Sequence, residues 1–104
     1  MTNVDFSKAR ITDSDFSKAI FQNSNIKKAK VNNVDFSKAI FTDTDLSDTL
    51  FENCVFYATN FKTNNKFKNT NFSLSNLENT IFINQDQEKT WQLKHRHLGN
   101  LLYK

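Results

Sequence analysis

The sequence has very few of the residues on which most turns and cross-links depend. It contains no proline, one glycine and one cysteine in 104 residues. Turns must therefore be made by asparagine, aspartate, serine and threonine, through hydrogen bonds from side chain to backbone and tolerance of positive φ angles. The single cysteine excludes an internal disulfide framework and fits a reducing compartment.

Long hydrophobic runs are also missing, so the sequence shows neither a membrane span nor a signal peptide. We therefore expect a soluble, cytoplasmic protein with no membrane partner. A dominant charge of one sign is missing too, since residues 1–85 carry 10 basic and 9 acidic side chains and the whole chain has a formal charge of +3. The excess of positive charge is small and evenly distributed along the chain, which makes nucleic acid an unlikely partner.

Groups of residues that could perform catalysis or bind a metal do not emerge from the sequence. His95 and His97 are two positions apart in a stretch expected to be helical, where such side chains point in different directions. Gly99 is the only glycine, so there is no glycine-rich phosphate loop. Cys54 occupies a position expected to be buried, where a thiol is inert. We expect no enzyme, no cofactor and no small-molecule substrate.

The most prominent feature of the sequence is a large apolar residue at every fifth position. All 11 phenylalanines belong to this series, which shifts by one residue at 63–66 and then resumes. A period of five matches neither a helix nor a strand, so the backbone must turn a corner every five residues. The centres are Phe6, Ile11, Phe16, Phe21, Ile26, Val31, Phe36, Phe41, Leu46, Phe51, Phe56, Phe61, Phe67, Phe72, Leu77 and Phe82.

A small residue precedes most centres by two positions, as Ala39 precedes Phe41 and Thr44 precedes Leu46. This unit resembles the pentapeptide-repeat family, in which a small residue is followed by Asp or Asn, then Leu or Phe, then two variable residues. The resemblance implies an all-β fold, a right-handed quadrilateral β-helix of about four coils over residues 1–85. Residues 86–104 would form a C-terminal helical cap or dimerisation element.

Four repeats per coil place residues about 20 apart directly above one another. Each side of the square, here called a face, then stacks four centres in a column. Face one stacks Phe6, Ile26, Leu46 and Phe67; face two stacks Ile11, Val31, Phe51 and Phe72; face three stacks Phe16, Phe36, Phe56 and Leu77; face four stacks Phe21, Phe41, Phe61 and Phe82. The one-residue shift is expected to be absorbed as a bulged corner.

The two ends of the repeat differ. At the C-terminal end we expect a helix from an N-cap at Asp86 to a C-cap at Gly99, with Trp91 and Leu98 on one face and Leu101 and Leu102 following. It would cover the last coil, form a dimer contact, or do both. At the other end Met1 already falls on the series, which suggests end-to-end pairing, a covering partner or truncation from a longer chain.

The residue before each centre points outward and is usually polar. On face four it is Ile20, Ile40, Asn60 and Ile81, and Leu50 has the same role on face two. An aligned apolar column indicates a contact with a partner protein or a second copy, although β-branched residues also favour strands for their own sake. We therefore expect a non-catalytic interaction or structural module.

The alternative implied by the resemblance is a DNA mimic that modulates DNA gyrase or topoisomerase. Such mimicry needs a negative surface to imitate phosphates. A net charge of +3 with regularly spaced lysines, and a rod of only four coils, disfavour it.

Overall fold

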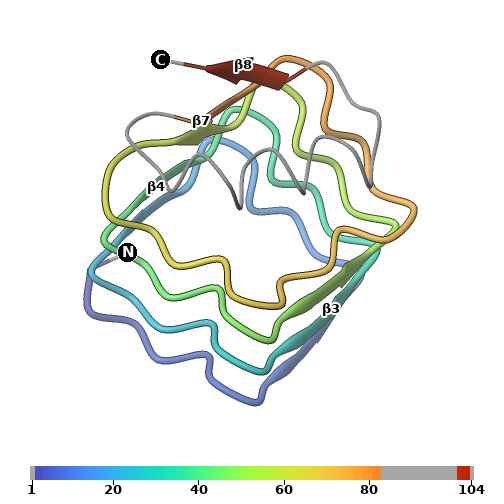
Figure 1. Cartoon of the computed structure of the whole chain (residues 1–104). Helices are drawn as coiled ribbons and strands as arrows, with labels where there is room; N and C mark the ends of the chain where they lie inside the picture. Colours follow the sequence, from blue (N-terminus) through green and yellow to red (C-terminus); the bar gives the residue numbers. More distant parts are fainter. Residues whose placement is uncertain (1, 83–100, 104) are drawn as a thin grey trace.

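The chain winds four times around a square outline in a computed structural model that describes residues 2–82 and the backbone of residues 101–103 (Figure 1). We divide this solenoid into coil one (residues 2–21), coil two (22–41), coil three (42–61) and coil four (62–82). Each side of the square is about one pentapeptide long. The all-β solenoid of about four turns predicted from the sequence is confirmed.

The strands lie on two opposite sides of the square and form two parallel sheets. Face two carries the three-stranded sheet β1-β3-β5, and face four carries the five-stranded sheet β2-β4-β6-β7-β8. Their bounds are β1 Arg10–Thr12, β2 Ile20–Gln22, β3 Lys30–Asn32, β4 Ile40–Thr42, β5 Leu50–Glu52, β6 Asn60–Phe61, β7 Thr80–Phe82 and β8 Leu101–Tyr103.

Faces one and three are built differently, from single β-bridges followed by tight turns. The side chain before the centre accepts a hydrogen bond from the backbone N–H two residues ahead, as Asp5 does from Ser7 at 2.9 Å and Asp15 from Ser17 at 2.8 Å. The centre carbonyl then accepts the N–H three residues ahead, as Phe16 does from Ala19 at 3.0 Å. Aspartate and asparagine are suited to this turn because their short side chains imitate a backbone carbonyl.

Every corner of the square contains one residue with a positive φ angle. Asparagine and aspartate occupy ten of these sixteen positions, which confirms part of the expected turn chemistry. The expectation was wrong for the other six, which are Lys8, Lys18, Lys28, Lys38, Ala58 and Leu74. Serine and threonine take none of the sixteen positions. Layer-to-layer hydrogen bonds fix the conformation at these corners, so residues with a weaker preference for positive φ are accepted.

The interior is filled by the predicted columns of centres. Phe41 lies between Phe21 and Phe61 with ring centroids 4.8 and 4.9 Å away and interplanar angles of 6° and 19°. Phe61 stacks on Phe82 in the same way at 5.0 Å. Rings of neighbouring columns meet edge to face, as Phe51 and Phe56 do at 88°. Both arrangements are favourable for aromatic quadrupoles.

The small residues of coils three and four do more than make room for the rings. Each donates a hydrogen bond to the carbonyl of a centre 23 or 24 residues earlier in the chain, as Thr59 does to Phe36 at 2.7 Å and Thr70 to Leu46 at 2.6 Å. The eight donors are Thr44, Thr49, Cys54, Thr59, Asn65, Thr70, Ser75 and Thr80. In coil two the corresponding positions after Ser24 hold Ala29, Val34 and Ala39, whose side chains have no donor for this bond.

The one-residue shift is absorbed at the corner before face one of coil four. Pairing changes from a spacing of 20 residues to one of 21, as at Asp45 with Lys66. The side chain of Asn65 closes the gap, since its oxygen accepts the Thr44 N–H at 3.0 Å and its amide donates to the Phe41 carbonyl at 2.9 Å. The face order is preserved on both sides of the shift, as predicted.

The last residues that the structure describes form one more strand of the solenoid. Leu101–Tyr103 form strand β8, which pairs in parallel with β7 and adds a further strand to the sheet of face four (Figure 1). Residues 86–104 were expected to form a helical cap or dimerisation element with its helix between Asp86 and Gly99, so this strand lies beyond the expected helix. The helix expected between Asp86 and Gly99 lies outside the described residues. Within the described part of the chain, no helix is long and apolar enough to cross a membrane.

Candidate interaction surfaces

The outer side of the face-four sheet carries the predicted isoleucine column. Parallel pairing sets Ile20 beside Ile40, Ile40 beside Asn60, and Asn60 beside Ile81. Ile20 is 53% exposed, whereas Ile40 and Ile81 are half-buried. We call Ile20, Ile40 and Ile81 the isoleucine column. Its alignment confirms the predicted register, but its role in binding stays a prediction.

Asn60 interrupts the isoleucine column with a polar side chain. Its Oδ1 atom is buried and has no hydrogen-bond partner in the described part of the protein. A buried acceptor left without a donor costs free energy, typically about 1–3 kcal/mol.

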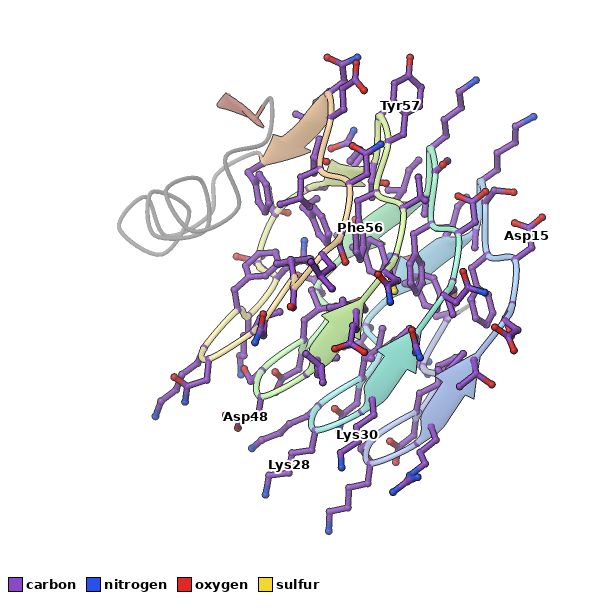
Figure 2. All side chains as sticks on the ribbon, turned by 90° about the vertical axis from the view of Figure 1, so that its right-hand side faces the viewer. Asp15, Lys28, Lys30, Asp48, Phe56 and Tyr57 are labelled. Atoms are coloured by element: carbon purple, nitrogen blue, oxygen red, sulfur yellow. The ribbon has the colours of Figure 1, made fainter. Side chains whose placement is uncertain are left out.

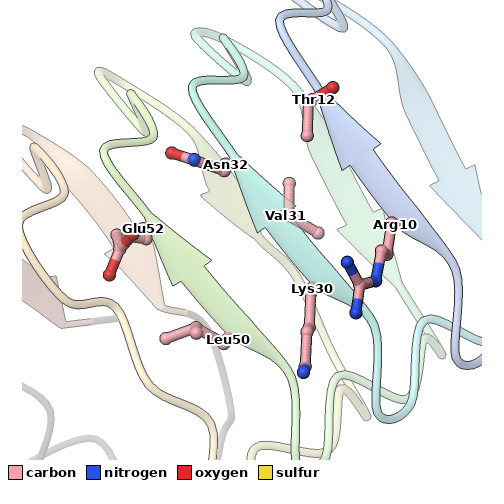
Figure 3. A pocket seen from close by; sticks show the side chains of 7 residues that line it. All are labelled: Arg10, Thr12, Lys30, Val31, Asn32, Leu50 and Glu52. Carbon is pink, nitrogen blue, oxygen red and sulfur yellow. The ribbon is translucent and has the colours of Figure 1, made fainter.

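Leu50, the fourth apolar residue predicted for contact, lies on the opposite side of the square. It follows Arg10 and Lys30 in register on face two, where it is half-buried. Together with Thr12 and Glu52 these residues line a shallow groove across β1, β3 and β5 (Figure 3). The structure therefore does not bring Leu50 together with the isoleucine column.

Two exposed apolar residues were missed by the sequence analysis. Tyr57 is 39% exposed and lies beside the corner between faces three and four (Figure 2). Leu74 is 79% exposed and has a φ angle of 56°, at a corner position where the other coils have Asp13, Asn33 and Asn53. Leu74 could have been found from the sequence, because it is two residues after the centre Phe72, and the residue at this position of each repeat lies at an outer corner.

The described residues offer no group of three or more histidine, cysteine or acidic side chains that could hold a metal ion. Cys54 is buried, as expected, and its thiol donates to the Val31 carbonyl at 3.5 Å. Burial raises the pKa of this thiol, so little thiolate forms near neutral pH. Hydrogen bonds from the Ser7 hydroxyl and N–H lower the pKa of Asp5, and those from Ser17 lower that of Asp15. These carboxylates therefore stay ionised and serve as turn caps.

The residues predicted for a cap or dimer contact fall at the edge of what the structure describes. Trp91 and Leu98 lie outside the described residues, as do His95 and His97. Leu101 and Leu102 belong to strand β8, for which the structure describes the backbone. Their role in covering the last coil or in dimerisation stays a prediction.

Comparison with solved structures finds the same kind of fold. One pentapeptide repeat protein of Nostoc PCC 7120 has a TM-score of 0.50 and 16% identity, with 96% of this chain and 84% of that chain covered. A second, from the Arabidopsis thaliana thylakoid lumen, has a TM-score of 0.48 and 23% identity over 89% of this chain and 75% of its own.

A third is HetL of the cyanobacterium Nostoc sp. strain PCC 7120, which is involved in heterocyst differentiation regulation. It has a TM-score of 0.45 and 19% identity over 78% of this chain, which spans 39% of HetL. At these identities the likeness concerns the fold alone. No curated protein is significantly similar to this chain in sequence.

Models of protein families, unlike the solved structures, assign this chain to a family. Two models, both described as pentapeptide repeats, match residues 6–50 with nine copies and residues 39–79 with eight copies. Together they span most of the solenoid, and their unit agrees with the observed pattern of small residue, outward residue and buried centre. The chain belongs to the pentapeptide repeat family.

Proposed function

We propose that this protein is a non-catalytic interaction module that binds a partner protein through the isoleucine column. The observation that supports the proposal is the alignment of Ile20, Ile40 and Ile81 on the outer side of one flat parallel sheet. Isolated apolar residues are common on protein surfaces, but an aligned column of them is typical of a binding surface.

Strand propensity alone does not explain the isoleucine column. The strands of face two have the same length and pairing, yet the same outward position there holds Arg10 and Lys30 in the first two coils. The fold therefore accepts charged residues at this position. Exposed isoleucine on face four lowers solubility, and the fold does not require it there. A binding role would explain its presence.

The surroundings of the column indicate the chemistry of the partner. Lys18 and Lys38 lie at the adjacent corner, and Tyr57 lies beside that corner in coil three. An apolar strip with a cationic and aromatic rim fits a protein surface with aliphatic side chains at its centre and carboxylates around it.

The test replaces two isoleucines of the column with lysine, as Ile20→Lys together with Ile40→Lys. Loss of the partner in a pull-down, or loss of self-association in sedimentation velocity, is the expected result. The matched control is Gln22→Lys with Thr42→Lys, which adds the same charge to the same two strands. Equal binding by both variants and the wild type would reject the column as the contact.

DNA mimicry is disfavoured by the charge distribution. Coils one and two carry seven basic and four acidic residues, and a mimic needs the opposite sign. Inhibition of gyrase supercoiling by the purified protein would overturn this view.

A further inference from the structure

Stacking of the coils gathers five cationic side chains at one corner of the square. Lys8 and Lys28 occupy the corner between faces one and two in successive coils, where the Lys8 N–H donates to the Lys27 carbonyl at 2.9 Å. Arg10 and Lys30 are paired in register on the face-two side of this corner, and Lys27 lies on its face-one side. We call these five residues the basic corner.

The sequence alone does not show this cluster, because the five residues are spread over residues 8–30. Seven basic residues occur in coils one and two, and five of them belong to the basic corner. The other two, Lys18 and Lys38, lie at the diagonally opposite corner. Figure 2 shows Lys28 and Lys30 at the lower edge of the molecule, far from Tyr57 near that opposite corner.

The nearby carboxylates are engaged in the fold and do not pair with these cations. Asp5 accepts the Ser7 N–H at 2.9 Å, and Asp48, stacked above Lys28, accepts the Asn69 side-chain amide at 3.2 Å. Glu52 lines the far side of the face-two groove in coil three (Figure 3). Among the residues that the structure describes, no ion pair neutralises the basic corner. The acids lower the local potential, but they leave the ammonium and guanidinium groups available to an external anion.

We propose that the basic corner binds the phosphate backbone of double-stranded nucleic acid without reading its sequence. The corner is a convex ridge with Lys8 and Lys28 at its apex. Lys27 lies on one side of the apex, and Arg10 and Lys30 lie on the other. A groove of a duplex is concave and has a row of phosphates along each rim, so cations on both sides of a ridge can reach both rows.

Other anionic partners fit the corner less well. Binding of single strands relies on aromatic stacking, and the exposed ring among the described residues, Tyr57, lies near the opposite corner. Binding within a membrane interface relies on exposed apolar side chains beside the cations, and the apolar neighbour of Lys30 on face two, Leu50, is half-buried. The thin net charge of the chain argued against nucleic acid. The fold, however, gathers at one corner five cations that are spread along the sequence, so the local charge is much higher than the net charge suggests.

The test measures binding of the full chain to a fluorescently labelled duplex by anisotropy over a range of salt concentrations. Five phosphate contacts predict a slope of about −4.5 in log K against log salt, so raising salt from about 50 to 200 mM weakens binding by about 500-fold. The variant pair Lys8→Gln and Lys28→Gln should reduce the slope by about 2 and the low-salt affinity by about tenfold or more.

The chain offers a closely matched control for this variant. Lys18→Gln with Lys38→Gln changes the same residue type, at the same positive-φ corner position, in the same two coils and with the same change of net charge. Its affinity should stay within about twofold of wild type. Circular dichroism confirms that both variants remain folded.

Four outcomes would overturn the proposal. Equal weakening by the two variant pairs would attribute binding to net charge. Loss of binding in Lys94→Gln with Arg96→Gln but not in the corner variant would place it in the C-terminal segment. Corner-dependent binding to anionic vesicles without binding to duplex would identify a membrane instead. Absence of duplex binding at about 50 mM salt would reject the site altogether.

Discussion

Coils one and two and coils three and four share one backbone plan but are held to their neighbours in different ways. Between coils one and two the small residues are mainly alanine and valine, which fill space without hydrogen-bonding to the centres below. In coil three, and again in coil four, four side chains donate to carbonyls of centres 23 or 24 residues earlier, as Thr49 does to Ile26 at 2.6 Å. The small residue two positions before each centre therefore only fills space in most repeats of coils one and two, whereas in coils three and four it also hydrogen-bonds to the layer below.

This difference shows which part of the repeat is essential for the fold. Both halves keep the backbone hydrogen bonds and the inward centres, so the extra donors are not required to form the solenoid. Each adds about 0.5–1.5 kcal/mol of net stability and fixes one layer on the next. We therefore expect stability to increase from coil one towards coil three, in keeping with the half-buried state of Phe6, Ile11 and Phe16.

The largest expected effect comes from removing a ring in the middle of a column. Phe41→Ala should lower the free energy of unfolding by about 3–5 kcal/mol, because Phe41 is fully buried between two stacked rings. Phe6→Ala, in the half-buried first coil, should cost about half as much or less. Urea denaturation of both variants measures the difference, and equal losses would contradict the gradient along the axis.

Exchanging donors between the halves should alter stability in opposite directions. Thr59→Val removes the bond to the Phe36 carbonyl but keeps the shape, and should cost about 1–2 kcal/mol. Ala39→Thr, one coil below in the same column, would supply a donor for the Phe16 carbonyl and should stabilise by up to about 1 kcal/mol. Thermal denaturation reports both changes. A destabilising Ala39→Thr would show that the first interface is too tight for a hydroxyl.

The corner at Leu74 should be relieved by a residue that accepts positive φ. Leu74→Asn matches Asn53 in the coil below and should stabilise by about 1 kcal/mol, because leucine is disfavoured in the left-handed region. The reverse change, Asn53→Leu, should destabilise by a similar amount. The free energy of unfolding should therefore rise for Leu74→Asn and fall for Asn53→Leu. A change of the same sign in both variants would contradict the conformational explanation.

The smallest expected effect concerns acid pH. Asp15 has a pKa below its usual value of about 3.9, because the Ser17 hydroxyl and N–H stabilise its charged form. Its contribution to stability is therefore complete above this usual value and is lost as pH falls through the lower, folded pKa. Asp15→Asn keeps the accepting oxygen but not the charge. Its melting temperature should fall slightly less than that of wild type between pH 5 and pH 2, with Asp13→Asn as the control.

The core was fully predictable from sequence because each inward centre repeats at a fixed interval. Phe51 and Phe72 were placed in one column across the shift, and their rings stack at 5.3 Å. The period is the physical constraint here, since any other alignment would turn apolar rings outward. The position of the bulge was also predictable, because only the polar stretch 63–66 breaks the series.

The two kinds of side were missed, although the sequence contained the signal. Aspartate or asparagine precedes most centres of faces one and three, whereas Arg10, Ile20, Lys30 and Ile40 precede those of faces two and four in the first two coils. The first group caps turns and the second forms strands. Strand β8 could not be foreseen, because its pairing with β7 follows 18 residues without the five-residue period.

The candidate surfaces were predictable only in part. The isoleucine column follows from a spacing of about one coil, so sequence alone aligned it. The basic corner contains residues that are close in sequence and residues that are one coil apart. A count of charge along the chain does not show that these two sets lie together. The exposure of Tyr57 depends on how far its side chain projects from the corner, which the period does not specify, whereas Leu74 could have been found from its corner position.

The stacked phenylalanines of face four also limit how the length of such a chain can vary. Each ring has the ring of the next coil as its neighbour at 4.8–5.0 Å, so the column is an in-register array contained within one molecule. Removing residues 22–41 as a block would put Phe61 on Phe21 and leave every column continuous. Removing a number of residues that is not a multiple of five from inside a side would take every later centre out of the columns. Insertions and deletions that preserve the columns therefore come in multiples of five residues, or as single residues at a corner such as the one that Asn65 closes.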